Sequence, residues 1–124
     1  MKIKSLNPVI VTPDGENLVR TWVELHGFRI IHHLHGFVGA DDVEYVLEND
    51  EGVRMDIIYR PDAGSTAHQA IRLNVDNFDE ALAYYLDRGF TVLAGPQETE
   101  HFRRALVRHP VDGGHCVIFE HKKH

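Results

Sequence analysis

The sequence predicts an α+β fold built from two tandem βαβββ modules. Two segments begin with the same pattern, a strand, an aspartate, an amphipathic helix and a Gly-Phe pair. The first segment covers residues 9–28 and reads VIVTPDGENLVRTWVELHGF, and the second covers residues 70–90 and reads AIRLNVDNFDEALAYYLDRGF. An offset of 62 residues relates three pairs of landmarks: Asp14 and Asp76, Gly27 and Gly89, and Phe28 and Phe90. Three landmarks at one offset indicate an internal duplication.

The second copy of this pattern shows both periodicities most clearly. Ile71, Leu73 and Val75 alternate with polar residues, which is typical of a strand with one apolar face. Asp76 is expected to accept hydrogen bonds from the first N–H groups of the following helix, which Gly89 should end. The apolar stripe of that helix consists of Phe78, Leu82, Tyr85 and Leu86.

The remaining elements follow from turn residues and strand patterns. In the first module we expect a strand at 2–12, a helix at 14–26 and strands at 29–35, 43–48 and 53–60, with the turn Asn49-Asp50-Glu51-Gly52 before the last strand. In the second module we expect a strand at 68–75, a helix at 77–88 and strands at 90–94, 102–108 and 115–121, with loops at Gly95-Pro96 and residues 110–114. The chain of 124 residues is therefore interpreted as a single domain, with module 1 at 1–60, a linker at 61–67 and module 2 at 68–122.

Composition excludes several functional classes. A formal net charge of −6 argues against binding to nucleic acid, because affinity for phosphate backbones depends on clustered Lys and Arg. The apolar runs are too short to span a membrane, and the N-terminal MKIKSLNPVIV lacks the features of a signal peptide. The single cysteine, Cys116, has no partner for an intramolecular disulfide, and it shares the helix-packing face of its strand with Ile118. These features favour the cytoplasm.

The duplicated strand-Asp-helix-Gly-Phe opening, with a Pro-Val-Asp-Gly-Gly turn before the last strand, resembles the vicinal oxygen chelate superfamily. That superfamily includes glyoxalase I, extradiol dioxygenases, methylmalonyl-CoA epimerase and the bleomycin resistance proteins. The resemblance covers nearly the whole chain. It implies curled mixed sheets that form a half-barrel cavity, and a homodimer with ligand sites at or near the interface.

In metal-dependent members, each module supplies one ligand from its first strand and one from its fourth. The resemblance places these positions at Asn7, Ala70, Asp56 and Val117. Only Asp56 is a good donor, so the resemblance predicts that no cofactor is bound, and one donor does not make a metal site. Asp56 is the best candidate for a catalytic residue.

A rearranged metal site is the alternative. Strand alternation places His68 on the face of Ala70, and His115 and His121 on the face of Val117. These histidines together with Asp56 could hold Zn, Ni, Mn or Fe as a divalent ion. Glu120 should point away from this face.

The same alternation defines the predicted ligand-binding residues. They are Asn7, Arg54, Asp56, Arg72, Asn74 and Phe119, with Val9, Val11, Ile58 and Val117 as apolar neighbours. Two arginines there suit a carboxylate or phosphate ligand. The alternative interpretation is a structural ion pair between Asp56 and an arginine. Phe37, in a loop, is a further candidate for stacking on a ligand.

Three histidines in IIHHLHGF suggest a metal cluster, but adjacent strand residues face opposite sides. Only His33 and His35 share a face, and His32 does not. A solvated or interface strand is the favoured interpretation of this segment.

We therefore expect a metal-independent small-molecule-binding protein similar to the bleomycin resistance proteins. The competing hypothesis is an enzyme, a lyase, isomerase or dioxygenase that uses Asp56 and nearby histidines. A third is a structural or regulatory protein whose pocket is occluded.

Overall fold

A computed structural model describes residues 2–37, 41–61, 68–111 and 114–122, without the side chains of residues 68 and 69. The predicted linker at 61–67, the predicted loop at 110–114 and the segment between the predicted strands at 29–35 and 43–48 lie partly outside the described residues, and the side chain of His68 lies wholly outside them. The chain divides into two compact units. The N-terminal unit covers residues 8–69, and the C-terminal unit covers residues 1–7 and 70–124.

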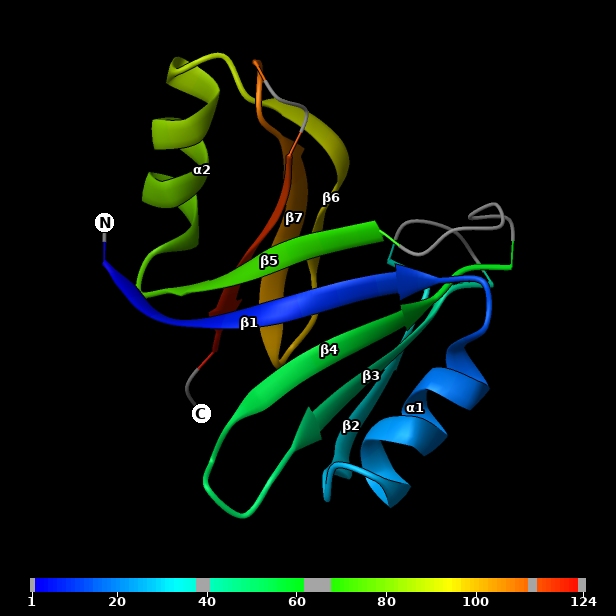
Figure 1. Cartoon of the computed structure of the whole chain (residues 1–124). Coiled ribbons are helices and arrows are strands. Elements are labelled where there is room, and N and C mark those ends of the chain that lie inside the picture. Colours follow the sequence, from blue (N-terminus) through cyan, green and yellow to red (C-terminus); the bar gives the residue numbers. More distant parts are fainter. Residues whose placement is uncertain (1, 38–40, 62–67, 112–113, 123–124) are drawn as a thin grey trace. The chain divides into compact units, whose positions relative to one another are not determined.

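Each unit has the predicted βαβββ order (Figure 1). The N-terminal unit contains part of β1 (Ile3–Thr12), α1 (Gly15–Glu24), β2 (Arg29–His35), β3 (Val43–Glu48) and β4 (Arg54–Tyr59). The C-terminal unit contains β5 (His68–Val75), α2 (Phe78–Asp87), β6 (Thr91–Glu98), β7 (Phe102–Arg108) and β8 (His115–His121). The predicted α+β class and the βαβββ order of both halves are confirmed.

The strand pairing is mixed in both units. In the N-terminal unit the strand order is β2-β3-β4-β1, with β1 and β4 parallel and the other pairs antiparallel. In the C-terminal unit β5 and β8 are parallel, and the order continues antiparallel through β7 to β6. Residues 3–7 of β1 belong to the C-terminal unit, whereas the duplication in the sequence assigns all of this strand to the first module.

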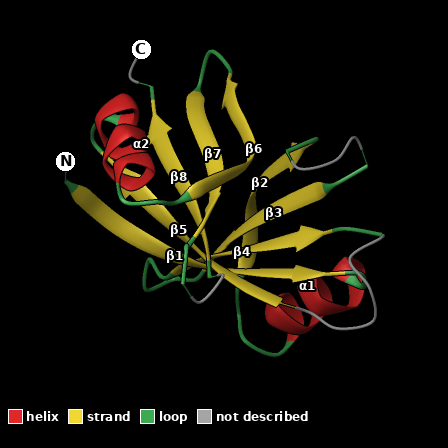
Figure 2. Cartoon of the chain, turned by 90° about the horizontal axis from the view of Figure 1, so that it is seen from above, coloured by secondary structure: helices red, strands yellow, loops and turns green. Residues whose placement is uncertain are grey.

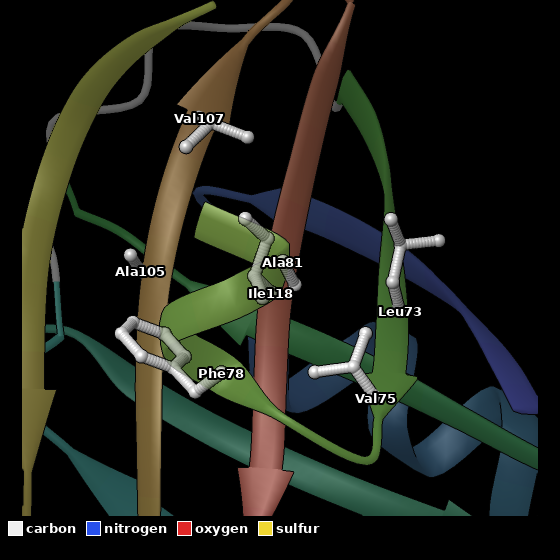
Figure 3. Close-up of a cluster of buried hydrophobic side chains, with 7 residues drawn as sticks. All are labelled: Leu73, Val75, Phe78, Ala81, Ala105, Val107 and Ile118. Carbon is white, nitrogen blue, oxygen red and sulfur yellow. The ribbon is translucent and has the colours of Figure 1, made fainter. Parts of the chain in front are cut away.

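One helix packs on each sheet (Figure 2). In the C-terminal unit, Phe78 and Ala81 of α2 point toward apolar side chains of three strands (Figure 3). The strand residues of this cluster are Leu73, Val75, Ala105, Val107 and Ile118. In the N-terminal unit the corresponding cluster consists of Val19, Leu47, Met55 and Ile57. These clusters identify the helix-facing side of each sheet, and Cys116 packs against the first of them as predicted.

The ends of the helices agree with the sequence in part. Phe28 N–H donates to Trp22 C=O and Phe90 N–H to Tyr85 C=O, which closes both helices at the predicted Gly-Phe pairs. The N-cap of α2, however, is Asn77, and the Asp76 side chain accepts instead from the Lys2 N–H. The prediction of Asp76 as the cap is therefore wrong by one residue, because the β5 strand ends at Val75 and Asp76 lies one residue before the cap position.

The predicted loop at Gly95-Pro96 is also wrong, because both residues lie within β6. The register between β6 and β7 shifts between Ala94 and Gln97, so the strand accommodates the pair as a bulge. A bulge places extra residues in one strand without ending its pairing. β6 therefore extends to Glu98, beyond the predicted end at residue 94.

Candidate functional site

Two arginines lie on the side of the C-terminal sheet opposite α2. Arg72 on β5 is two residues from Ala70 and pairs in register with Val117, and Arg104 on β7 pairs with Phe119. Because Leu73 and Ala105 belong to the helix-facing cluster, the side chains of Arg72 and Arg104 lie on the other face. The strands thus bring together two cations that are 32 positions apart in the sequence.

Both guanidinium groups stack on aromatic rings. Arg72 lies over the ring of Phe119 at 4.5 Å, and Arg104 lies over the ring of Phe102 at 5.0 Å. The two phenylalanine rings are themselves stacked, with centroids 5.1 Å apart. Arg72 is 3% exposed and Arg104 is 1% exposed. We call these four residues, Arg72, Arg104, Phe102 and Phe119, the arginine–aromatic face.

A bulge in β6 orients one neighbour of this face. Gln97 accepts a hydrogen bond of 2.7 Å from Nε of Arg104. Gly95, at φ +81°, lies where a Cβ atom would come within 2.9 Å of the Arg104 carbonyl oxygen and the Gln97 nitrogen. Glycine at position 95 therefore permits the close approach of β6 to β7 that places Gln97 on Arg104.

Amide groups continue the polar face onto β1. Asn74 Nδ2 donates to Ser5 Oγ at 2.9 Å and to Asn7 Oδ1 at 3.3 Å. Asn7 is 2% exposed and Asn74 is 9% exposed. The Oδ1 atom of Asn74 is buried and accepts no hydrogen bond from the residues that the structure describes. An acceptor oxygen is thus available beside the arginine–aromatic face.

A cavity of about 750 Å³ lies at the ends of β5 and β8 in the C-terminal unit. Its lining residues are Lys2, Lys4, Val75, Asp76, Glu120, His121 and Lys122. The His121 ring contacts the ring of Phe119, with centroids 4.8 Å apart. His121 therefore lines the cavity and also contacts one ring of the arginine–aromatic face.

In the N-terminal unit, the side opposite α1 carries buried carboxylates. Asp56 on β4 is fully buried and pairs in register with Val9 and with Val46. Met55 and Ile57 belong to the helix-facing cluster, so Asp56 faces the other side, as strand alternation requires. Glu44, 5% exposed, lies on the same side because it pairs with Ile58.

Arg54 lies on the surface, whereas the other predicted ligand-binding residues are buried. It stands at the first position of β4, its side chain is 41% exposed, and its Nε atom lies 3.2 Å from Glu48 Oε1. It thus forms a surface ion pair with the neighbouring strand. Phe37, the further candidate for stacking on a ligand, is buried, with 9% of its surface exposed.

The positions at which the resemblance implies metal ligands do not fit a metal site within either unit. Ala70 and Val117 carry no donor atom, and Asn7 Oδ1 already accepts from Asn74. Within each unit, the described residues include no group of three His, Cys, Asp or Glu side chains that could hold a metal ion. For the rearranged site, the structure places His115 at the first residue of β8 and exposed His121 at the last. Glu120 points to the helix side, where it accepts from the Phe78 N–H.

Sequence reasoning missed Arg104, Gln97 and Glu44. Alternation within FRRALVR shows only that Arg103 and Arg104 face opposite sides, and it does not show which of them faces the helix. The register of β7 with β8 decides this, because Ala105 pairs with Ile118 on the helix side. Gln97 required knowledge of the bulge, and Glu44 required the register of β3 with β4.

The sequence matches no protein-family profile and no curated protein. The structure, however, is similar to solved structures over nearly its whole length. Methylmalonyl-CoA epimerase from Mycobacterium tuberculosis superposes with a TM-score of 0.72 at 14% identity, covering 98% of this chain and 90% of that chain. The fold is that of the vicinal oxygen chelate superfamily.

Two further structures have the same fold. A methylmalonyl-CoA epimerase from Streptomyces coelicolor in complex with 2-nitronate-propionyl-CoA has a TM-score of 0.69 at 17% identity, covering 96% of this chain and 95% of that chain. A hypothetical protein from Bacillus halodurans has a TM-score of 0.66 at 14% identity, covering 98% of both chains. The predicted fold is thus confirmed.

Among the described residues, no helix is long and apolar enough to cross a membrane.

Proposed function

We propose that this protein binds a small organic molecule through a carboxylate or phosphate group on the arginine–aromatic face, without a metal ion. The observation that carries the proposal is the pair of buried arginines, Arg72 and Arg104, each stacked on a phenylalanine. A guanidinium group presents parallel N–H donors that match both oxygens of a carboxylate or phosphate. Ion–ion attraction is stronger in a buried setting than in water.

The aromatic rings support the same proposal in two ways. Stacking on Phe119 and Phe102 restricts the planes of the guanidinium groups, so less conformational freedom is lost on binding. The stacked rings also offer flat apolar area to the uncharged part of a ligand. The cavity at the ends of β5 and β8, whose lining residue His121 contacts Phe119, would have room for that part.

The class of ligand follows from this chemistry. A methylmalonyl-CoA epimerase with the same fold has been solved in complex with methylmalonyl-CoA. That compound carries a carboxylate and phosphates, so it belongs to the class of anions that two arginines would recognise. It is therefore the first probe to test, beside malonyl-CoA, succinate and inorganic phosphate.

The test compares three arginine variants by calorimetric titration of these probes. Arg72→Lys and Arg104→Lys keep the charge but remove the paired N–H donors, so we expect binding to weaken tenfold or more. Arg103→Lys is the matched control, because Arg103 lies on the helix side, where it pairs with Asp79 and covers Phe78. It should bind as the wild type does. Binding that is unchanged in both test variants would contradict the proposal.

A second candidate function is an isomerase or lyase, and it rests on Asp56. A fully buried carboxylate on the face opposite α1 could act as a general base if substrate reached it. Incubation of methylmalonyl-CoA in D2O, followed by mass spectrometry, would reveal proton exchange at the carbon beside the thioester. Exchange that is lost in Asp56→Asn would establish the enzyme, and no exchange is expected of a binding protein.

Metal analysis tests the metal-dependent form of the second candidate, in which Asp56 would be a ligand. The protein should be purified untagged and without chelators, and then titrated with Zn²⁺, Ni²⁺, Mn²⁺ and Fe²⁺ while thermal stability is followed. We expect the metal content to be the same in the wild type and in Asp56→Ala. A stoichiometric metal that disappears in the variant would show that Asp56 is a ligand.

We also propose that the protein forms a homodimer, as the family resemblance implies. Light scattering should then give twice the mass of the chain. A compact monomer at the concentrations used for ligand titration would contradict a site at a dimer interface.

A further inference from the structure

His33 and His35 lie together on one face of β2 in the N-terminal unit. Their rings have centroids 4.7 Å apart and an interplanar angle of 50°. Both residues are exposed, and β2 is the last strand in the order of its unit. The register confirms the shared face, because His33 pairs with Tyr45 and His35 with Val43.

The position of His33 is held by its neighbour on β3. The His33 ring stacks on the Tyr45 ring at a centroid distance of 4.9 Å and an interplanar angle of 12°. Tyr45 is itself anchored, because it packs against the helix-facing cluster of this unit. A stacked ring has fewer orientations to lose when it binds a ligand.

His32 lies on the opposite face of the strand. It pairs with Val46, which shares the face of Asp56, and the register shift between Ile30 and His32 sets this arrangement. Of these three histidines, His33 and His35 therefore form a pair, and His32 lies apart from them. His33 and His35 are two positions apart, and residues at this spacing in a strand point to the same face, so both side chains can contact one ligand.

We propose that His33 and His35 chelate one divalent transition-metal ion, with water in the remaining coordination positions. Imidazole nitrogens are good ligands for Cu²⁺, Ni²⁺ and Zn²⁺. The distance between a zinc ion and an imidazole nitrogen is about 2.0–2.1 Å. Two ligands on one ion then have nitrogens roughly 3 Å apart, a separation that rings in contact reach by rotation about their side-chain bonds. The N-terminal unit has no group of three donors among its described residues, so the ion keeps open positions.

Isothermal titration with Cu²⁺, Ni²⁺ and Zn²⁺ tests the site in the full, untagged chain. The variants are His33→Ala and His35→Ala, with His32→Ala as the matched control on the same strand. Loss of either chelating ring should weaken one binding event at least tenfold, whereas His32→Ala should keep it. Affinity should be highest for Cu²⁺, in the order expected for nitrogen ligands.

Two results would overturn the site. One is equal metal binding by the wild type and all three variants, and the other is an equal loss in His32→Ala. A second measurement is independent of affinity: substoichiometric Cu²⁺ should broaden the imidazole NMR signals of His33 and His35 before that of His32. Broadening of His32 first would also overturn the proposal. An Asp56→Asn variant should leave this site intact, which separates it from the metal-dependent alternative discussed above.

Discussion

Single residues decide how the arginine–aromatic face is arranged. Arg103 and Arg104 are adjacent and chemically identical, yet Arg103 lies 26% exposed over the helix and Arg104 is 1% exposed on the opposite face. Arg103 donates to both carboxylate oxygens of Asp79, at 2.8 and 2.7 Å. One residue of the pair thus belongs to a surface ion network and the other to the candidate site.

Gly95 provides a test of this arrangement at the residue scale. We predict that Gly95→Ala lowers the free energy of unfolding by about 1–3 kcal/mol, because a Cβ atom would meet the backbone of Arg104 and Gln97 at 2.9 Å. It should also weaken any ligand that binds Arg104. Urea unfolding and the ligand titration measure the two effects.

Gly52→Ala is the control for this substitution. Gly52 has the same φ of +81°, but an added Cβ would meet nothing within 4 Å. It should therefore cost only the left-handed conformation, about 1 kcal/mol. Equal losses in the two variants would show that the close approach at Gly95 has no structural importance.

At the scale of the element, the two helices begin in different ways. The Asn77 side chain accepts from the Glu80 N–H at 3.0 Å, and Glu120 of β8 accepts from the Phe78 N–H at 2.6 Å. Asp14 is the N-cap of α1, but its side chain accepts from the Asn17 side chain and not from the helix backbone. The duplicated sequences have thus diverged at the start of the helix while keeping its end.

We predict that Asn77→Ala destabilises the protein by about 1 kcal/mol, because the Glu80 N–H in the first turn of α2 loses its acceptor. Asp14→Ala is the matched change at the start of α1, and it should cost less. Chemical denaturation at neutral pH compares the two. A larger loss for Asp14→Ala would mean that the cap geometry does not determine the stability of these helices.

At the scale of the whole molecule, acidic groups on the C-terminal unit link stability to pH. Hydrogen bonds from Arg103 hold the pKa of Asp79 below its ordinary value of 3.8. The Lys122 ammonium lowers the pKa of Glu98 from 4.5, and the Lys2 N–H lowers that of Asp76 from 3.8. A lowered pKa in the folded state favours folding above the ordinary pKa, and this contribution is lost as the pH falls through the ordinary value toward the folded one.

We therefore predict that stability declines as the pH falls from about 5 to below 4, and that Arg103→Met makes the decline shallower. Urea midpoints measured across this range test the prediction. Arg20→Met is the control, because Arg20 donates to the neutral Asn17 side chain on the surface of α1. Since all three carboxylates are exposed, added salt should reduce the effect. A decline of the same steepness in Arg103→Met would contradict the assignment.

The elements and their order could be predicted from the sequence, because they depend on short-range features. Strand alternation around Leu73, the apolar stripe of α2 and the Gly-Phe pairs at 27–28 and 89–90 act within a few residues of each other. The predicted stripe is correct at Phe78, Leu82 and Tyr85, which belong to the cluster on the sheet or pack against it, and wrong at Leu86, which is exposed. The same alternation correctly placed Asp56, Arg72 and Phe119 on the side of their sheets away from the helices. Two other predictions from the sequence are wrong: the helix cap is Asn77 and not Asp76, and Gly95-Pro96 forms a bulge within β6 and not a loop.

Which side chains contact one another could not be predicted from the sequence, because these contacts depend on how the strands pair. Arg104 joins Arg72 because β7 and β5 both flank β8, and the register of those pairs sets both guanidinium groups over a stacked pair of rings. Gln97 reaches Arg104 because the bulge shifts the register of β6. A shift of one residue in any of these pairings would reverse the faces, and the alternation within a single strand contains no information about its register with another.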